Sequence, residues 1–205
     1  MQVTVINESG YEEALYGLSL SFKDRATNYS EWWTSERYEK MKALSFKMFN
    51  KDGGHNKFLE SMVVWIDIEA PRGWWQEFDT YRVGTTKQSE STMHTIQKRP
   101  VTLDDFEECT HLSMVVAFNE ILRDVTENFS NTKPLHDTDL ERIKNSLPEG
   151  YLQRRVVCLN YKVLRNMITQ RSTHRLRYWK DFIREVRNQV KYPTLLEIKD
   201  VRNRD

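Results

Sequence analysis

The stretch RRVVCLNYKVLRNMITQR, Arg154–Arg171, joins a predicted strand to a predicted helix. Its apolar run at 156–159 is typical of a strand, which we expect over 154–162. From residue 163 the apolar positions recur at helical spacing, and we predict a second long helix over 163–192 with a kink near Ser172. Asn160 and Lys162 therefore close the strand, and Asn166 begins the helix.

Basic side chains continue along this predicted helix. Arg171 and Arg175 lie one turn apart, and His174 and Arg177 accompany them. Guanidinium groups bind phosphate oxygens in a bidentate manner, so cations beside Asn amides indicate a site for a phosphate-bearing ligand. The alternative is a solvated basic face on a surface helix, which is the commoner meaning of a charge run.

The segments on either side predict an α+β protein. An edge strand is expected at 3–6 and an extended segment at 58–70, which Pro71 ends. Helices are expected at 11–22, 35–49 with Ser35 as its N-cap, 72–83, 104–129, 139–147 and after Pro193, with an ordered loop at 84–94. We predict a single domain over residues 1–205, with a small mixed or antiparallel sheet and two long helices.

Composition excludes several classes of protein. Lys plus Arg is 31 and Asp plus Glu is 30 among 205 residues, so the net charge of +1 disfavours a nucleic-acid binder. Two cysteines give no disulfide scaffold, and no Cys/His cluster has metal-binding spacing. The longest apolar run, at 62–66, is too short for a membrane span, and the N-terminus does not resemble a signal peptide. We therefore expect a cytoplasmic protein without a metal.

Several motifs occur in the order found in one protein family. In chain order they are Gly54-His55 with Phe58 and Glu60, Ala70-Pro71 with Arg82 eleven residues later, Arg142 before Leu147-Pro148, and Asn160, Lys162, Asn166 and Arg171. This combination resembles the flavin-dependent thymidylate synthase family, and the resemblance spans most of the chain. Lys162 stands where that family has Arg, and one residue is missing between His55 and Phe58.

The resemblance implies ligands, residue roles and an assembly. It places FAD against His55, Glu60, Asn160, Lys162, Asn166 and His174. It places a pyrimidine nucleotide such as dUMP against Arg82, Ser91, Arg142 and Arg171. Reduced nicotinamide and a folate take part if the family chemistry is retained, in which no covalent nucleophile comes from the protein. Relatives are homotetramers with sites between subunits, and the small, divergent chain resembles a phage-encoded protein of the host cytoplasm.

The family motif that begins Arg-His-Arg is altered in this chain. The matching stretch reads TYRVGTTKQSEST, residues 80–92, so Thr80 and Tyr81 replace the first Arg and the His, and the final Arg is absent. Ser91 matches only if one residue is inserted.

Different functions therefore stay open. One is a flavin-dependent enzyme that methylates or otherwise modifies a nucleotide base, with catalytic residues still unassigned. The other is a non-catalytic nucleotide-binding or protein-interaction module, in which Trp32, Trp33, Trp74 and Trp75 would serve as interface anchors.

Overall fold

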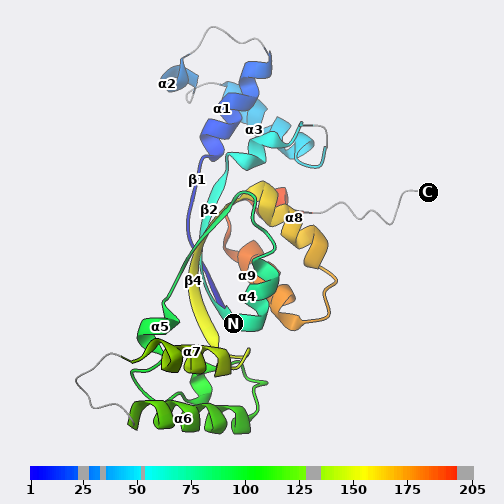
Figure 1. Ribbon diagram of the computed structural model, residues 1–205. Helices are drawn as coiled ribbons and strands as arrows, with labels where there is room; N and C mark the ends of the chain where they lie inside the picture. The colour runs from blue at the N-terminus through cyan, green and yellow to red at the C-terminus, as the bar shows by residue number, and fades with distance from the viewer. Residues whose placement is uncertain (23–27, 33–35, 52–53, 128–134, 198–205) are drawn as a thin grey trace. The chain divides into compact units, whose positions relative to one another are not determined.

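The protein has an antiparallel four-stranded sheet and several helices, which confirms the α+β prediction. The computed structural model describes residues 1–22, 28–32, 36–51, 54–127 and 135–197 (Figure 1). The strands are β1 (Gln2–Ser9), β2 (Val63–Pro71), β3 (Thr85–Ser89) and β4 (Leu152–Asn160). Their order in the sheet is β1-β2-β4-β3, so β1 is an edge strand, as predicted.

The described helices differ in length from one to four turns. They are α1 (Tyr11–Ser19), α2 (Tyr29–Trp32), α3 (Glu36–Met48), α4 (Arg72–Phe78), α5 (Thr92–Thr95), α6 (Leu112–Glu127), α7 (Asp137–Ser146), α8 (Tyr161–Arg171) and α9 (Arg177–Gln189). Short 3₁₀ helices lie at Leu20–Phe22, Lys57–Glu60, Leu103–Asp105 and Pro193–Leu196. None of these described helices is both long and apolar enough to cross a lipid bilayer.

The predicted long helix over 163–192 is wrong, because the chain forms two helices there. Helix α8 ends at Arg171 and α9 begins at Arg177. The last buried apolar residue of α8 is Ile168, and the next buried one is Trp179. Between them the side chains are polar or, like Leu176, 45% exposed, so nothing holds a continuous helix against a core.

Other element boundaries also need correction. The strand predicted over 154–162 ends at Asn160 and α8 begins at Tyr161, so Lys162 and Asn166 both lie within α8. The helix predicted from residue 104 begins at Leu112, because Phe106 instead pairs with Tyr151 in an antiparallel bridge. Helix α4 ends at Phe78, which leaves Arg82 in the loop that follows. The segment 84–94, expected to be a loop, contains β3 and α5. The predicted N-cap Ser35 lies outside the described residues.

The chain forms two compact units. The first unit comprises residues 1–2, 68–80 and 88–155, and the second comprises 3–67, 81–87 and 156–205. In the first unit, α6 lies beside α7 (Figure 1), and their apolar faces share one core. That core consists of Ile96, Val101, Phe106, Val115, Phe118, Leu122, Val125, Ile143, Leu147 and Tyr151.

The second unit holds α1, α3, α8 and α9 among its helices. Helix α8 packs against α9 and against the 3₁₀ helix Pro193–Leu196, and α1 packs against α3. The buried face of α9 consists of Trp179, Phe182, Ile183 and Val186. These positions recur at helical spacing, and burial of such a stripe is the main source of helix stability.

Three of the four tryptophans expected to anchor an interface are core residues instead. Trp32 belongs to the second unit, and Trp74 and Trp75 belong to the first; each is only 1% exposed. Side chains this deeply buried within the chain offer no surface to a partner. The fourth candidate, Trp33, lies outside the described residues.

Candidate functional site

The start of α8 is held by a helix cap and by a close turn. The side-chain Oδ1 of Asn160 accepts a hydrogen bond from the Val163 N–H at 2.9 Å, as an N-cap residue does. Gly84 has a φ of +68° and packs on this cap. A Cβ added to Gly84 would lie 3.1 Å from Asn160 Nδ2 and 3.0 Å from Val163 Cγ2, so only glycine fits this turn without strain.

Two of the predicted flavin residues form an ion pair beside this cap. Lys162, in the first turn of α8, places its Nζ 2.5 Å from Oε1 of Glu60, the last residue of a 3₁₀ helix. The two side chains are 41% and 54% exposed, so solvent screens the pair and both charges remain accessible.

The end of α8 carries a second cluster, around Arg171. The Arg171 Nε donates a hydrogen bond to the Tyr81 hydroxyl at 3.0 Å. Its guanidinium carbon lies 4.8 Å from the centroid of the Trp179 ring, in cation–π geometry. The Tyr81 hydroxyl in turn donates to Gln170 Oε1 at 2.9 Å, and Gln170 Nε2 donates to Asn166 Oδ1 at 3.1 Å. Predicted nucleotide and flavin residues are thus linked in one chain of hydrogen bonds.

His174 lies in the connection between α8 and α9. Its Nδ1 accepts a hydrogen bond from the Leu176 N–H at 3.3 Å, and its ring centroid is 6.5 Å from that of Trp179. A shallow depression of about 720 Å³ opens here. Its lining residues are Gln170, Thr173, His174, Arg175 and Leu176. A concave surface with a guanidinium and an imidazole is suited to an anionic ligand.

The other predicted residues of the second unit are on the surface. His55 is exposed in the turn before the 3₁₀ helix at 57–60, Asn166 is exposed on α8, and Arg82 is exposed next to Tyr81. The sequence motifs therefore lead to two small clusters in this unit, Lys162 with Glu60 and Asn166 with Arg171. Tyr81, Gln170 and Trp179, which shape the second cluster, were not predicted.

The remaining predicted nucleotide residues, Ser91 and Arg142, belong to the first unit. Ser91 is the exposed N-cap residue of α5, and its carbonyl accepts a hydrogen bond from the Thr95 hydroxyl at 3.0 Å. Arg142 is exposed on α7, with its Nη2 3.9 Å from Asp124 Oδ2 on α6. An exposed pair at this distance contributes little to stability, so the guanidinium is available for other contacts.

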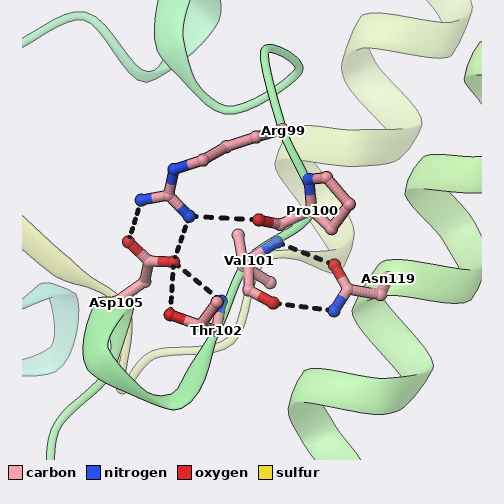
Figure 2. A network of polar contacts seen from close by, with 6 residues as sticks. All are labelled: Arg99, Pro100, Val101, Thr102, Asp105 and Asn119. Atoms are coloured by element: carbon pink, nitrogen blue, oxygen red, sulfur yellow. Dashed lines mark hydrogen bonds and ion pairs between the residues drawn. The ribbon is translucent and has the colours of Figure 1, made fainter.

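The first unit also contains a cavity of about 470 Å³ that the sequence did not predict. Carboxylates dominate its charged lining, which consists of Glu69, Glu90, Asp104, Asp105, Lys98 and Arg99. Arg99 is committed to Asp105 through two hydrogen bonds of 2.7 and 2.6 Å (Figure 2). We expect such a lining to repel a phosphate, because like charges oppose each other strongly where water is scarce.

Burial and neighbouring charges shift the pKa values of three groups in this cavity. Burial raises the pKa of the Glu90 carboxyl, and burial together with the nearby carboxylates raises the pKa of the Tyr151 phenol. Hydrogen bonds from Arg99 lower the pKa of Asp105. Among the residues that the structure describes, no group of carboxylates, histidines and cysteines has the geometry of a metal site.

Comparison with known proteins finds matches among solved structures. No protein-family model matches this sequence, and no curated protein sequence matches it. The fold is similar to flavin-dependent thymidylate synthase ThyX from Helicobacter pylori complexed with FAD and dUMP, with 18% sequence identity and a TM-score of 0.75 over 96% of this chain and 98% of that one. A second structure of that enzyme with FAD and dUMP has a TM-score of 0.74 at 18% identity, over 96% and 97% of the two chains. This chain therefore has the flavin-dependent thymidylate synthase fold, as its motifs predicted.

Proposed function

We propose that this chain binds a pyrimidine nucleotide of the dUMP type and FAD, and that it modifies the nucleotide base. The observation that carries the proposal is the arrangement around Arg171. Its guanidinium is fixed by the Tyr81 hydroxyl and by the Trp179 ring, beside a depression lined with His174 and Arg175. Such preorganised cations suit a phosphate, and the similar structures are complexes with dUMP.

The residues at the start of α8 fit a flavin. FAD carries a pyrophosphate and a ring system rich in hydrogen-bond acceptors, and this region offers the Lys162 ammonium and the exposed Asn166 amide. We assign FAD binding to His55, Glu60, Asn160, Lys162, Asn166 and His174. When bound, FAD supplies the redox chemistry, and the protein supplies orientation and electrostatics.

Nucleotide binding is assigned to Arg82, Ser91, Arg142 and Arg171. We further propose methylation of the base with reduced nicotinamide and a folate, in a homotetramer of the host cytoplasm, with the chain encoded by a phage.

The test begins with protein purified without added cofactor. We expect a flavin absorption band after incubation with FAD that survives gel filtration, and a calorimetric signal on titration with dUMP. Arg171→Ala should weaken dUMP binding about 10- to 100-fold, since a hydrogen bond to a charged group contributes about 1.5–3 kcal/mol. Asn166→Ala should lower FAD retention.

Arg184→Ala is the matched control, because Arg184 lies on α9 in ion pairs with Asp181 and Glu185. This variant should bind both ligands like the unmodified protein. Unchanged dUMP affinity in Arg171→Ala would contradict the assignment of the nucleotide site.

A second function is a nucleotide-binding module without turnover. It is favoured by residues 80–92, where Thr80 and Tyr81 stand in place of family cations and Arg82 and Lys87 are the cations that remain. Binding of dUMP without FAD, and no nucleotide-dependent oxidation of reduced nicotinamide, would establish this function. Oxidation that depends on both FAD and dUMP would exclude it.

A further inference from the structure

We propose that Tyr81 and Gln170 are positioning residues that hold the Arg171 guanidinium for the phosphate of its ligand. This inference rests on the proposed nucleotide site. Neither residue was predicted as a site residue, and Tyr81 stands where the resembling family has a histidine.

The geometry gives Arg171 little freedom to turn. Its Nε is 3.0 Å from the Tyr81 hydroxyl oxygen, which accepts the hydrogen bond. Its guanidinium carbon lies 4.8 Å from the Trp179 ring centroid and 5.7 Å from that of Tyr81. A guanidinium that is held at Nε and packed on two rings has a defined plane, and bidentate binding of a phosphate depends on the direction of that plane.

The hydroxyl of Tyr81 is itself oriented. It donates its hydrogen to Gln170 Oε1 at 2.9 Å, which leaves a lone pair directed to Arg171 Nε. Gln170 is fixed by its own donation to Asn166 Oδ1 at 3.1 Å. The Gln170 amide thus fixes the direction of the Tyr81 hydroxyl hydrogen, and the hydroxyl oxygen fixes the orientation of the Arg171 guanidinium.

The exposed fractions of these side chains indicate that Tyr81 acts on Arg171 and does not contact the ligand itself. Tyr81 is 8% exposed and Trp179 is fully buried, whereas Arg171 is half-buried. The buried tyrosine therefore supports the guanidinium from the protein interior, and the more exposed Arg171 is left to contact the ligand. The rings of Tyr81 and Trp179 also contact each other edge to face, with centroids 6.0 Å apart, so the tyrosine ring is supported independently of its hydroxyl.

The experiment is a double-mutant cycle with Tyr81→Phe and Arg171→Ala, with dUMP binding followed by calorimetry. Phenylalanine keeps the ring and removes only the hydroxyl. We expect Tyr81→Phe to weaken dUMP binding about tenfold, which corresponds to about 1.4 kcal/mol. In the Arg171→Ala background the same change should have no further effect, because the tyrosine acts only through the arginine.

Three further variants sharpen the test. Gln170→Leu should reproduce much of the loss seen in Tyr81→Phe, while Tyr81→His, which restores a ring nitrogen that can accept the Nε hydrogen, should recover part of it. Tyr29→Phe is the control, since it removes an exposed hydroxyl that bonds to Glu13 at 3.0 Å. The Arg171 Hε resonance provides a readout without any ligand: it should be protected from exchange and lose that protection in Tyr81→Phe.

The outcomes separate this inference from the proposed function. If dUMP binds and Tyr81→Phe binds it equally well, the positioning role is wrong and the nucleotide site stands. Additive losses in the cycle would also overturn the inference. If dUMP does not bind, the proposed function fails. Inorganic pyrophosphate then replaces dUMP as the probe. Loss of pyrophosphate binding in Tyr81→Phe would then support positioning, and no binding of either probe would overturn both.

Discussion

Lys162 Nζ lies 2.5 Å from Glu60 Oε1, so the cation assigned to the flavin is neutralised by a carboxylate from a different part of the chain. An anionic cofactor has to compete with Glu60 for this ammonium. The pair is partly exposed, so its own contribution to folding is small, about 1 kcal/mol or less. Under the proposed function, the pair therefore matters for cofactor affinity more than for stability.

The first prediction concerns FAD affinity. Glu60→Gln removes the charge that competes for the Lys162 ammonium, keeps a polar side chain at this position, and should tighten FAD binding. Lys162→Met removes the cation and should weaken FAD binding. Flavin fluorescence during titration measures these changes, and the unfolding midpoints of both variants should stay close to that of the unmodified protein. A flavin affinity unaffected by Lys162→Met would remove this residue from the site.

The second prediction concerns the turn on the α8 cap. Gly84→Ala should destabilise the protein by about 1–3 kcal/mol, because the left-handed backbone and the contacts with Asn160 and Val163 both oppose a Cβ. Gly17→Ala is the matched control, since a Cβ there meets no atom within 4 Å on helix α1. That substitution should stabilise the protein by about 0.5–1 kcal/mol. Urea unfolding distinguishes the two, and equal effects would contradict the close-packed turn.

The third prediction concerns alkaline pH. Burial and the hydrogen bond to Glu8 raise the pKa of Tyr161 above its ordinary value of 10.0, and burial raises the pKa of Tyr192 to about 12. Because both pKa values are higher in the folded state, the stability they confer is complete below pH 10 and is lost as the pH rises beyond it. We expect the free energy of unfolding to fall between about pH 10 and 12.

Tyr161→Phe and Tyr192→Phe should each flatten this fall, relative to the variant's own stability at neutral pH. Tyr29→Phe, which alters an exposed hydroxyl, should leave the slope unchanged. Chemical denaturation at several alkaline pH values measures the slopes. A slope that is the same in all three variants would show that these phenols do not govern alkaline unfolding.

The fourth prediction concerns the loop before α6. Asn119 on α6 accepts a hydrogen bond from the Val101 N–H at 2.8 Å and donates one to the Val101 carbonyl at 2.8 Å (Figure 2). Val101 is 5% exposed, so Asn119→Leu leaves two backbone groups without partners. We expect a loss of about 2–4 kcal/mol in the free energy of unfolding. Asn145→Ala, at an exposed position on α7, should change it by less than about 0.5 kcal/mol.

The sequence predicted those parts of the fold that depend on neighbouring residues. A strand followed by a helix within Arg154–Arg171 was predicted from an apolar run and helical spacing, although the strand was expected to end at residue 162 and β4 ends at Asn160. The edge strand β1 and helices α1, α3 and α7 were predicted on similar local grounds. Between α8 and α9 only a kink near Ser172 was predicted, because basic residues continue through the break without a Gly or Pro and the absence of buried side chains marks it.

The candidate site was predicted only in part, for a related reason. Asn160, Lys162, Asn166 and Arg171 follow from motif spacing. Tyr81 is separated from Gln170 and Arg171 by about 90 residues, and nothing in its local sequence indicates that contact. The available signal was the replacement of a family histidine by tyrosine. Similarly, the start of α6 depends on the pairing of Phe106 with Tyr151, which local periodicity does not contain.

The fluorescence of Trp179 can report ligand binding at Arg171, because the indole ring lies against the guanidinium. A charge that lies 4.8 Å from an indole shifts its emission energy, and an anion that neutralises the guanidinium shifts it back. Ligand titrations can therefore be followed by intrinsic fluorescence without a label. The Trp179→Phe variant gives the background emission of the other five tryptophans.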